Sequence, residues 1–274
     1  MTLLLAGLSS VLWGIADFLG GFFSRKLKVS FVLLVSQFFG MISVAFYAWI
    51  TGEVWSEQAL PFASLAGITG LLGLAFFYTA LSTGPMGIVS PIAALGAIVP
   101  VAYGYSQGEA PSTLQWIGIV VAIVGVTLAS GPELTGAVSA RPIIFAALAA
   151  ISFGSCLIFL AKGGTLSVTT TAIGMRIQSV VILAIVVLVA KSYTKVQGSE
   201  WLWLAVIGVF DIGANVSLTV AAQSGLLSLV GMLGSLYPVI TVLLARIVLN
   251  ERLRSIQYVG VAVALSGVVA IATG

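Results

Sequence analysis

Gln115-Trp116-Ile117-Gly118, with Gly125 seven residues further on, has a second version in Gln257-Tyr258-Val259-Gly260, with Gly267 seven residues further on. A glutamate precedes each version, and an apolar run containing a proline precedes each glutamate. Two arginines follow closely on the second glutamate, whereas no Lys or Arg accompanies the first. A repeated motif whose basic residues differ between the copies predicts two related halves that lie in opposite orientations across a membrane.

The repeat continues through most of the chain. Trp13-Gly14 in the first half corresponds to Phe153-Gly154 in the second. Further matches follow in the same order, with Gly67, Ala80 and Gly84 corresponding to Gly208, Ala221 and Gly225. We therefore expect two domains, residues 1–135 and 136–274, with the linker between them in Gly131–Arg141.

The composition indicates an integral membrane protein. The 274-residue chain is 60% apolar and 7% charged, with a mean hydropathy of +1.20, whereas a soluble domain is about 25% charged. This composition makes the lipid bilayer the expected partner. The net charge of +3 is small and scattered along the chain, so nucleic acid is not an expected partner. One cysteine cannot form an intrachain disulfide, and the lack of histidine excludes an imidazole metal site, so neither metal nor cofactor is expected.

Ten apolar runs have the length of about 20 residues that a membrane-spanning helix needs. Helices are expected because every backbone polar group must find a partner inside the bilayer. The expected fold is therefore all-α, with ten transmembrane helices arranged as two inverted five-helix repeats. The runs are Leu3–Phe23, Val29–Ile50, Pro61–Leu81, Gly87–Tyr105, Thr113–Ser130, Pro142–Ala161, Thr170–Ala190, Trp201–Ala222, Leu226–Leu249 and Ser255–Thr273.

Basic residues gather in the connections that follow odd-numbered runs. These residues are Arg25, Lys26, Lys28, Arg141, Lys191, Lys195, Arg252 and Arg254. The connections after even-numbered runs hold only Lys162, together with three glutamates. Because positive residues favour the cytoplasmic side, we expect both termini outside, in the plasma or inner membrane.

The chain resembles the drug/metabolite transporter superfamily, in its ten-helix EamA-type branch. The motifs that carry the resemblance are Leu12-Trp13-Gly14, Asp211-Ile212-Gly213-Ala214-Asn215, Ser235-Leu236-Tyr237-Pro238 and Asn250-Glu251-Arg252-Leu253. The resemblance implies a carrier of small organic solutes such as amino acids, drugs or other metabolites. It also implies a role for Arg176, because the family often has an arginine at this place, whereas the equivalent stretch of the first half reads Val35-Ser36-Gln37-Phe38.

Polar and aromatic side chains inside the spans are the candidate solute-binding residues. They are Trp13, Asp17, Gln37, Tyr78, Arg176, Asp211, Asn215 and Tyr237. A charge at the bilayer centre costs at least about 2.5–3.5 kcal/mol, so Asp17 and Asp211 should face a wet cavity or a partner. Both are candidates for binding a coupling cation, and in a chain without histidine a carboxylate would have to carry any coupled proton.

Structural alternatives remain open for each of these residues. Either aspartate could form an ion pair with Arg176, the amides could bond between helices, and the aromatic rings could serve packing. Pro91, Pro100, Gly234 and Pro238 are candidate hinges, because paired breaks in corresponding helices mark the moving parts of carriers. Close packing of the bundle is the alternative for these four.

The sequence predicts a secondary transporter and no enzyme. It lacks the Gly-rich phosphate-binding loop of ATPases, a His-Glu-x-x-His motif and any Ser-His pair. We expect alternating access, with the solute bound between the halves, and export by analogy with the family. Coupling to protons and uncoupled facilitation both remain open. A non-transporting membrane sensor or structural subunit is the alternative.

Overall fold

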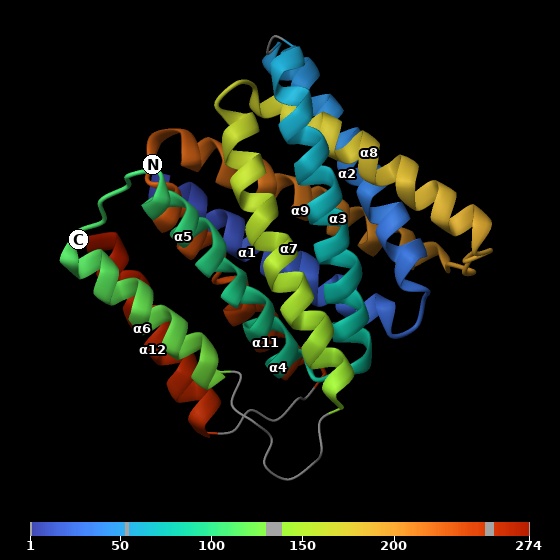
Figure 1. Ribbon diagram of the computed structural model, residues 1–274. Helices are drawn as coiled ribbons and strands as arrows, with labels where there is room; N and C mark the ends of the chain where they lie inside the picture. Colours follow the sequence, from blue (N-terminus) through green and yellow to red (C-terminus); the bar gives the residue numbers. More distant parts are fainter. Residues whose placement is uncertain (1, 53–54, 130–138, 250–254, 274) are drawn as a thin grey trace.

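The computed structural model describes residues 2–52, 55–129, 139–249 and 255–273, and these are almost entirely helical (Figure 1). Most of the predicted linker and the Asn250–Leu253 motif, with Arg252 and Arg254 after the ninth span, lie outside the described residues. The helices are α1 (Thr2–Ser24), α2 (Val29–Thr51), η1 (Glu57–Ala59), α3 (Leu60–Thr83), α4 (Met86–Ala94), η2 (Leu95–Ala97), α5 (Ile98–Ser106), α6 (Thr113–Ala129), α7 (Ala140–Gly164), α8 (Val168–Val189), α9 (Gly198–Ser224), α10 (Leu227–Gly234), α11 (Tyr237–Leu249) and α12 (Ser255–Thr273).

The predicted all-α, multi-span fold is confirmed. Eight helical segments among the described residues are long and apolar enough to cross a membrane. Inside lipid an α-helix pairs its own backbone groups, which is why nearly every apolar run takes this form. Short turns end the helices: α2, for example, stops at Gly52, whose φ of 59° lies in the left-handed region that favours glycine.

Two of the ten expected spans are broken near their centres. The run Gly87–Tyr105 divides into α4, η2 and α5, and the run Leu226–Leu249 divides into α10 and α11. A proline inside a helix lacks the N–H that would bond to the carbonyl four residues earlier, and its ring clashes with that carbonyl. For Pro100 that carbonyl belongs to Gly96 in η2, and for Pro238 it belongs to Gly234, the last residue of α10. Each break therefore lies one turn before its proline.

Polar groups freed at the second break find partners on another helix. The Ser10 hydroxyl in α1 donates to the carbonyl oxygen of Leu233 and, at 2.9 Å, to that of Gly234. On the far side of the break the Thr241 hydroxyl donates to the Gly14 carbonyl at 3.1 Å. Such side-chain partners allow a broken helix to persist at membrane depth.

The helix contacts are preserved when the two halves are exchanged. α1 packs on α9 as α7 packs on α3, and α2 packs on α9 as α8 packs on α3. α2 also contacts its own counterpart α8, and α6 contacts its counterpart α12. Contacts between counterparts lie on the axis that relates two repeats. With five expected spans in each half, an odd number, the halves are predicted to cross the membrane in opposite directions.

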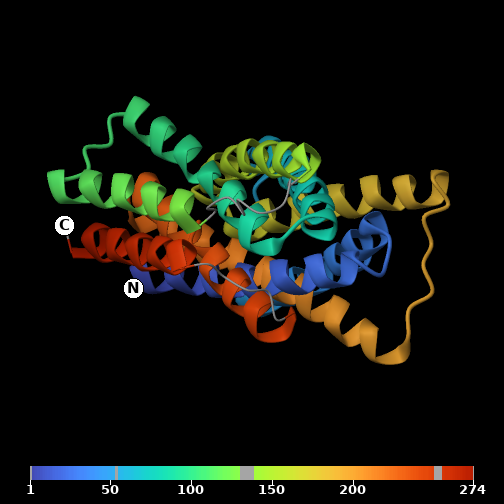
Figure 2. The same ribbon diagram turned by 90° about the horizontal axis from the view of Figure 1, so that it is seen from below.

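Glycines set the closest helix crossings. A Cβ at Gly208 in α9 would collide with the Ser36 carbonyl of α2, and one at Gly267 in α12 would lie 2.7 Å from the Gly118 carbonyl of α6. The α6–α12 pair forms one edge of the molecule, and α8 extends toward the opposite edge (Figure 2). Small residues drive such close packing in lipid, where no hydrophobic effect acts between helices.

Candidate functional site

A cavity lies between the α1–α9 pair and the α3–α7 pair, with about 670 Å³ of space unfilled by atoms, its open end included. Residues from both broken spans reach it, including Gly96 and Ala97 of η2 and Tyr237 of α11. Helices α2 and α8 complete the lining through Gln37 and Arg176. The cavity is thus surrounded by the elements that meet across the two halves.

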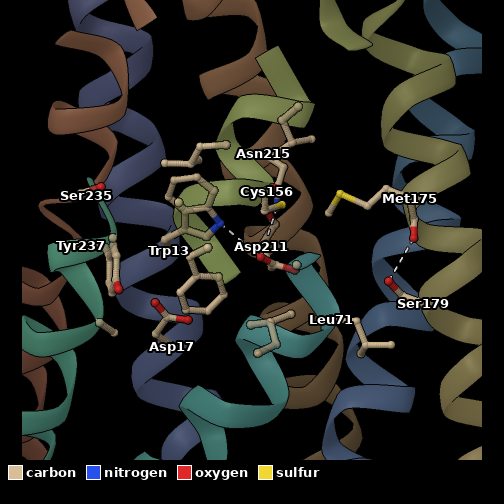
Figure 3. A pocket seen from close by; sticks show the side chains of 18 of the residues that line it. Trp13, Asp17, Leu71, Cys156, Met175, Ser179, Asp211, Asn215, Ser235 and Tyr237 are labelled. Carbon is tan, nitrogen blue, oxygen red and sulfur yellow. Dashed lines mark hydrogen bonds between the residues drawn. The ribbon is translucent and has the colours of Figure 1, made fainter. Parts of the chain in front are cut away.

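Asp211 of α9 is the centre of a buried polar network. Its carboxylate accepts hydrogen bonds from Trp13 Nε1 at 3.2 Å and from Gln37 Nε2 at 3.2 Å. Asn215, one turn further along the helix, donates from Nδ2 to the same carboxylate at 3.2 Å and to the Asp211 carbonyl at 2.6 Å. Arg176 Nη2 pairs with Asp211 Oδ2 at 2.8 Å. The carboxylate therefore has four donors around it (Figure 3 shows its bond to Trp13).

Arg176 is held on two sides at once. Its Nη1 donates to the Gln37 side-chain oxygen while its Nη2 contacts Asp211. The side chain is 1% exposed, so both contacts are shielded from water. Arg176 and Gln37 each stand eight residues after the first residue of their helices, α8 and α2. They occupy equivalent places in the repeat and meet across its axis.

Asp17 of α1 lies in the same cavity in a different environment. It is 5% exposed, yet no described side chain or backbone group forms a hydrogen bond or ion pair with its carboxylate. The buried hydroxyl of Tyr237 likewise has no hydrogen-bond partner among the described residues. In Figure 3 this hydroxyl points toward the Asp17 carboxylate. The close approach of α11 to α1 at Gly14, three residues before Asp17, places them together.

Seven of the eight candidate solute-binding residues line the cavity, and Tyr78 does not. The Tyr78 hydroxyl contacts the Ala16 carbonyl at 3.5 Å, and its ring fills the space that a side chain at Gly20 would need. Tyr78 therefore packs α3 against α1. The seven lining residues are Trp13, Asp17, Gln37, Arg176, Asp211, Asn215 and Tyr237.

The four candidate hinges lie at or near the breaks. Pro100 and Pro238 follow them by one turn, Gly234 ends α10, and Pro91 lies within α4. The broken spans also cross each other, since a Cβ at Gly231 would lie 3.1 Å from Cγ of Pro100. None of the four is among the described residues that line the cavity, and the hinge assignment remains a prediction about movement.

Sequence reasoning missed Phe153, whose ring lines the cavity beside α3. It packs edge to face on Phe77, with ring centroids 5.6 Å apart, and Phe77 packs in the same way on Tyr237 at 6.0 Å. A phenylalanine in an apolar helix gives no polar signal. The available signal was the repeat, because Phe153 is the counterpart of Trp13.

Comparison with known proteins places the chain in a family. Residues 1–131 and 140–273 match the EamA-like transporter family. The chain therefore belongs to that family of multi-pass membrane transporters, which is not a family of enzymes. A search of curated proteins finds no match. Among the solved structures that match, one crystal structure has a TM-score of 0.77 at 17% identity, over 98% of this chain and 95% of that one, which supports the fold alone.

Proposed function

We propose that this transporter is a secondary carrier of small organic solutes that binds its solute in the central cavity and works by alternating access. The observation that carries the proposal is the position of the cavity, between the two inverted halves and beside both broken spans. Broken helices next to a mid-membrane site are the recurrent design of carriers built from inverted repeats. Rocking of one half against the other would open the site to each side in turn.

Asp17 is the better of the two candidate coupling carboxylates. Asp211 is surrounded by donors, so its charge is already neutralised by Arg176. Asp17 has no polar partner among the described residues, and it can exchange a proton or a cation without breaking an existing contact. We infer that any coupling ion binds at Asp17. A carrier without such coupling would transport its solute only down the gradient.

Export is the proposed direction, through the plasma or inner membrane, with both termini outside. The test of the carrier proposal is solute flux in proteoliposomes containing the purified full-length protein. Candidate solutes come from a metabolite screen of cells that carry or lack the protein, where an exporter lowers the internal level of its solute. Specific binding without flux of any bound solute would favour the alternative, a membrane sensor or structural subunit.

A further inference from the structure

The charges of the cavity do not balance. In the described lining, the carboxylates are Asp17 and Asp211 and the one guanidinium is Arg176. Arg176 pairs with Asp211, which leaves the charge of Asp17 without a counter-ion among the described residues. An isolated buried carboxylate is costly, so a positively charged ligand next to Asp17 is strongly favoured over a neutral or negative one.

The charge of Arg176 is already compensated by Asp211. Its two terminal nitrogens contact Gln37 and Asp211. Its Nε has no hydrogen-bond partner among the described residues and lies 3.7 Å from the position that a Cβ on Gly40 would take, on the α2 side of the guanidinium. Among the described residues, no other lysine or arginine lines the cavity. A solute with a carboxylate would therefore lose its hydration and find no cation in the described lining that lacks a counter-charge.

The two walls of the cavity differ in polarity because equivalent positions of the two halves carry different side chains there. Asp17 corresponds to Leu157 in the second half, and Asp211 corresponds to Gly70 in the first. The α1–α9 wall therefore carries the acidic groups. The α3–α7 wall is apolar, with Leu71, Leu74, Phe153, Leu157 and Leu160. A ligand that fits both walls has a polar head on one side and an apolar body on the other.

We propose that the solute is an organic ammonium ion with an apolar or aromatic body and no carboxylate. Its ammonium group binds the Asp17 carboxylate and donates to the Tyr237 hydroxyl oxygen, and its body packs against Phe153 and the leucines of α3 and α7. The Trp13 and Tyr237 rings beside the head add cation–π attraction. This inference rests on the proposed carrier function, since it names the solute class of that cavity.

The test compares three probes that share a phenyl body: 2-phenylethylamine, phenylalanine and phenylacetate. Binding to the full-length protein in lipid nanodiscs is measured by calorimetry at neutral pH. The amine should bind at least about tenfold more tightly than phenylalanine or phenylacetate. Both of these carry a carboxylate that would stay unpaired in the cavity, and the amine carries none. Asp17→Asn should weaken amine binding about tenfold to a hundredfold, the loss expected for a charge-assisted hydrogen bond in a buried site.

Three further variants sharpen the result. Tyr237→Phe should weaken amine binding by a smaller factor, and Asp17→Glu should retain part of it. Glu57→Gln removes an exposed carboxylate at the start of η1 and should leave the amine affinity unchanged. If Asp17→Asn does not fold, unchanged amine affinity in both Asp17→Glu and Tyr237→Phe overturns the proposal, and reduced affinity supports it.

Equal or tighter binding of phenylalanine or phenylacetate would overturn the proposed solute class, as would failure of all three probes to bind. Flux measured on the same protein separates this result from the carrier proposal. Amine binding without flux rejects the carrier and keeps the cation site. Flux of the zwitterion or the anion without the amine keeps the carrier and rejects the cation site.

Discussion

Asp17 and Asp211 are the same residue type in the same cavity, yet they differ in what surrounds them. Asp211 balances Arg176, so Asp211→Asn would leave a buried guanidinium without its counter-charge. Breaking a buried ion pair in this way costs about 3–5 kcal/mol. We expect a clear fall in the thermal unfolding temperature of the purified protein in detergent. Asp17→Asn breaks no contact with a described residue and serves as the matched control. Equal unfolding temperatures for the two variants would contradict the network described above.

Arg176 tests the geometry of the same network. Its planar guanidinium reaches Gln37 and Asp211 simultaneously, which a single ammonium group cannot do with the same geometry. Arg176→Ala should therefore impair folding or transport, and Arg176→Lys should restore only part of the loss. The measurement is the yield of folded protein together with its flux in proteoliposomes. Full activity of the alanine variant would show that the residue has no role in the site.

Single-residue signals could predict the charged part of the site but not its partners. Asp17, Arg176 and Asp211 stand out because charges are rare in apolar spans. Which aspartate pairs with Arg176 depends on how α8 and α9 cross, and no local pattern encodes that crossing. The same limit applies to the tyrosines: Tyr78 and Tyr237 look alike in sequence, and only packing sends one hydroxyl to Ala16 and the other to the cavity.

At the scale of the helix, the sequence shows the prolines of the two broken spans. It does not show that both breaks lie beside one cavity. Each proline predicts a local kink. The position of the cavity depends on contacts between the halves, such as that of Gly231 with Pro100. Small side chains at such crossings are also common in bundles that do not move, which is why sequence alone left the hinge role open.

Replacing the two prolines should separate packing from movement. In Pro100→Ala and Pro238→Ala the new N–H can bond to the carbonyl of Gly96 or Gly234, so each span can continue as one helix. If the breaks move during transport, flux should fall several-fold while thermal stability is retained or raised. Pro61→Ala is the control, because this proline lies in the first turn of α3, where it is tolerated. Unchanged flux in both variants would assign the breaks to packing only.

For the whole molecule, the repeat and the ten spans could be predicted because both leave regular marks in the sequence. The side chains of the candidate site could not be predicted from the repeat, because they lie at positions where the two halves differ. The backbone keeps its two-fold relation, as the exchanged contacts of α1–α9 and α7–α3 show. The side chains at Asp17 and Leu157, or at Asp211 and Gly70, do not. The symmetric scaffold fits the proposed movement between two similar states, and the asymmetric lining is where we propose that the solute is selected.

The orientation of this scaffold gives the last prediction. Lys28, after the first span, donates from its backbone N–H to the Thr194 hydroxyl and from Nζ to the Lys191 carbonyl, each at 3.3 Å. The basic connections after the first and seventh spans therefore lie together at one end of the molecule. Glu109, in an even-numbered connection, accepts at 2.9 Å from the backbone N–H of Leu227, the first residue of α10 after the next-but-one even-numbered connection.

The clustering of basic connections at one end predicts that this end faces the cytoplasm, since positive residues are retained there. A reporter fused after Gly274 that is active only outside the cytoplasm should therefore be active, and one that requires the cytoplasm should be silent. The same reporters placed after Lys195 in truncated chains should give the opposite result. A cytoplasmic result at Gly274 would reverse the side assigned to every connection, and with it the side to which the cavity must open for export.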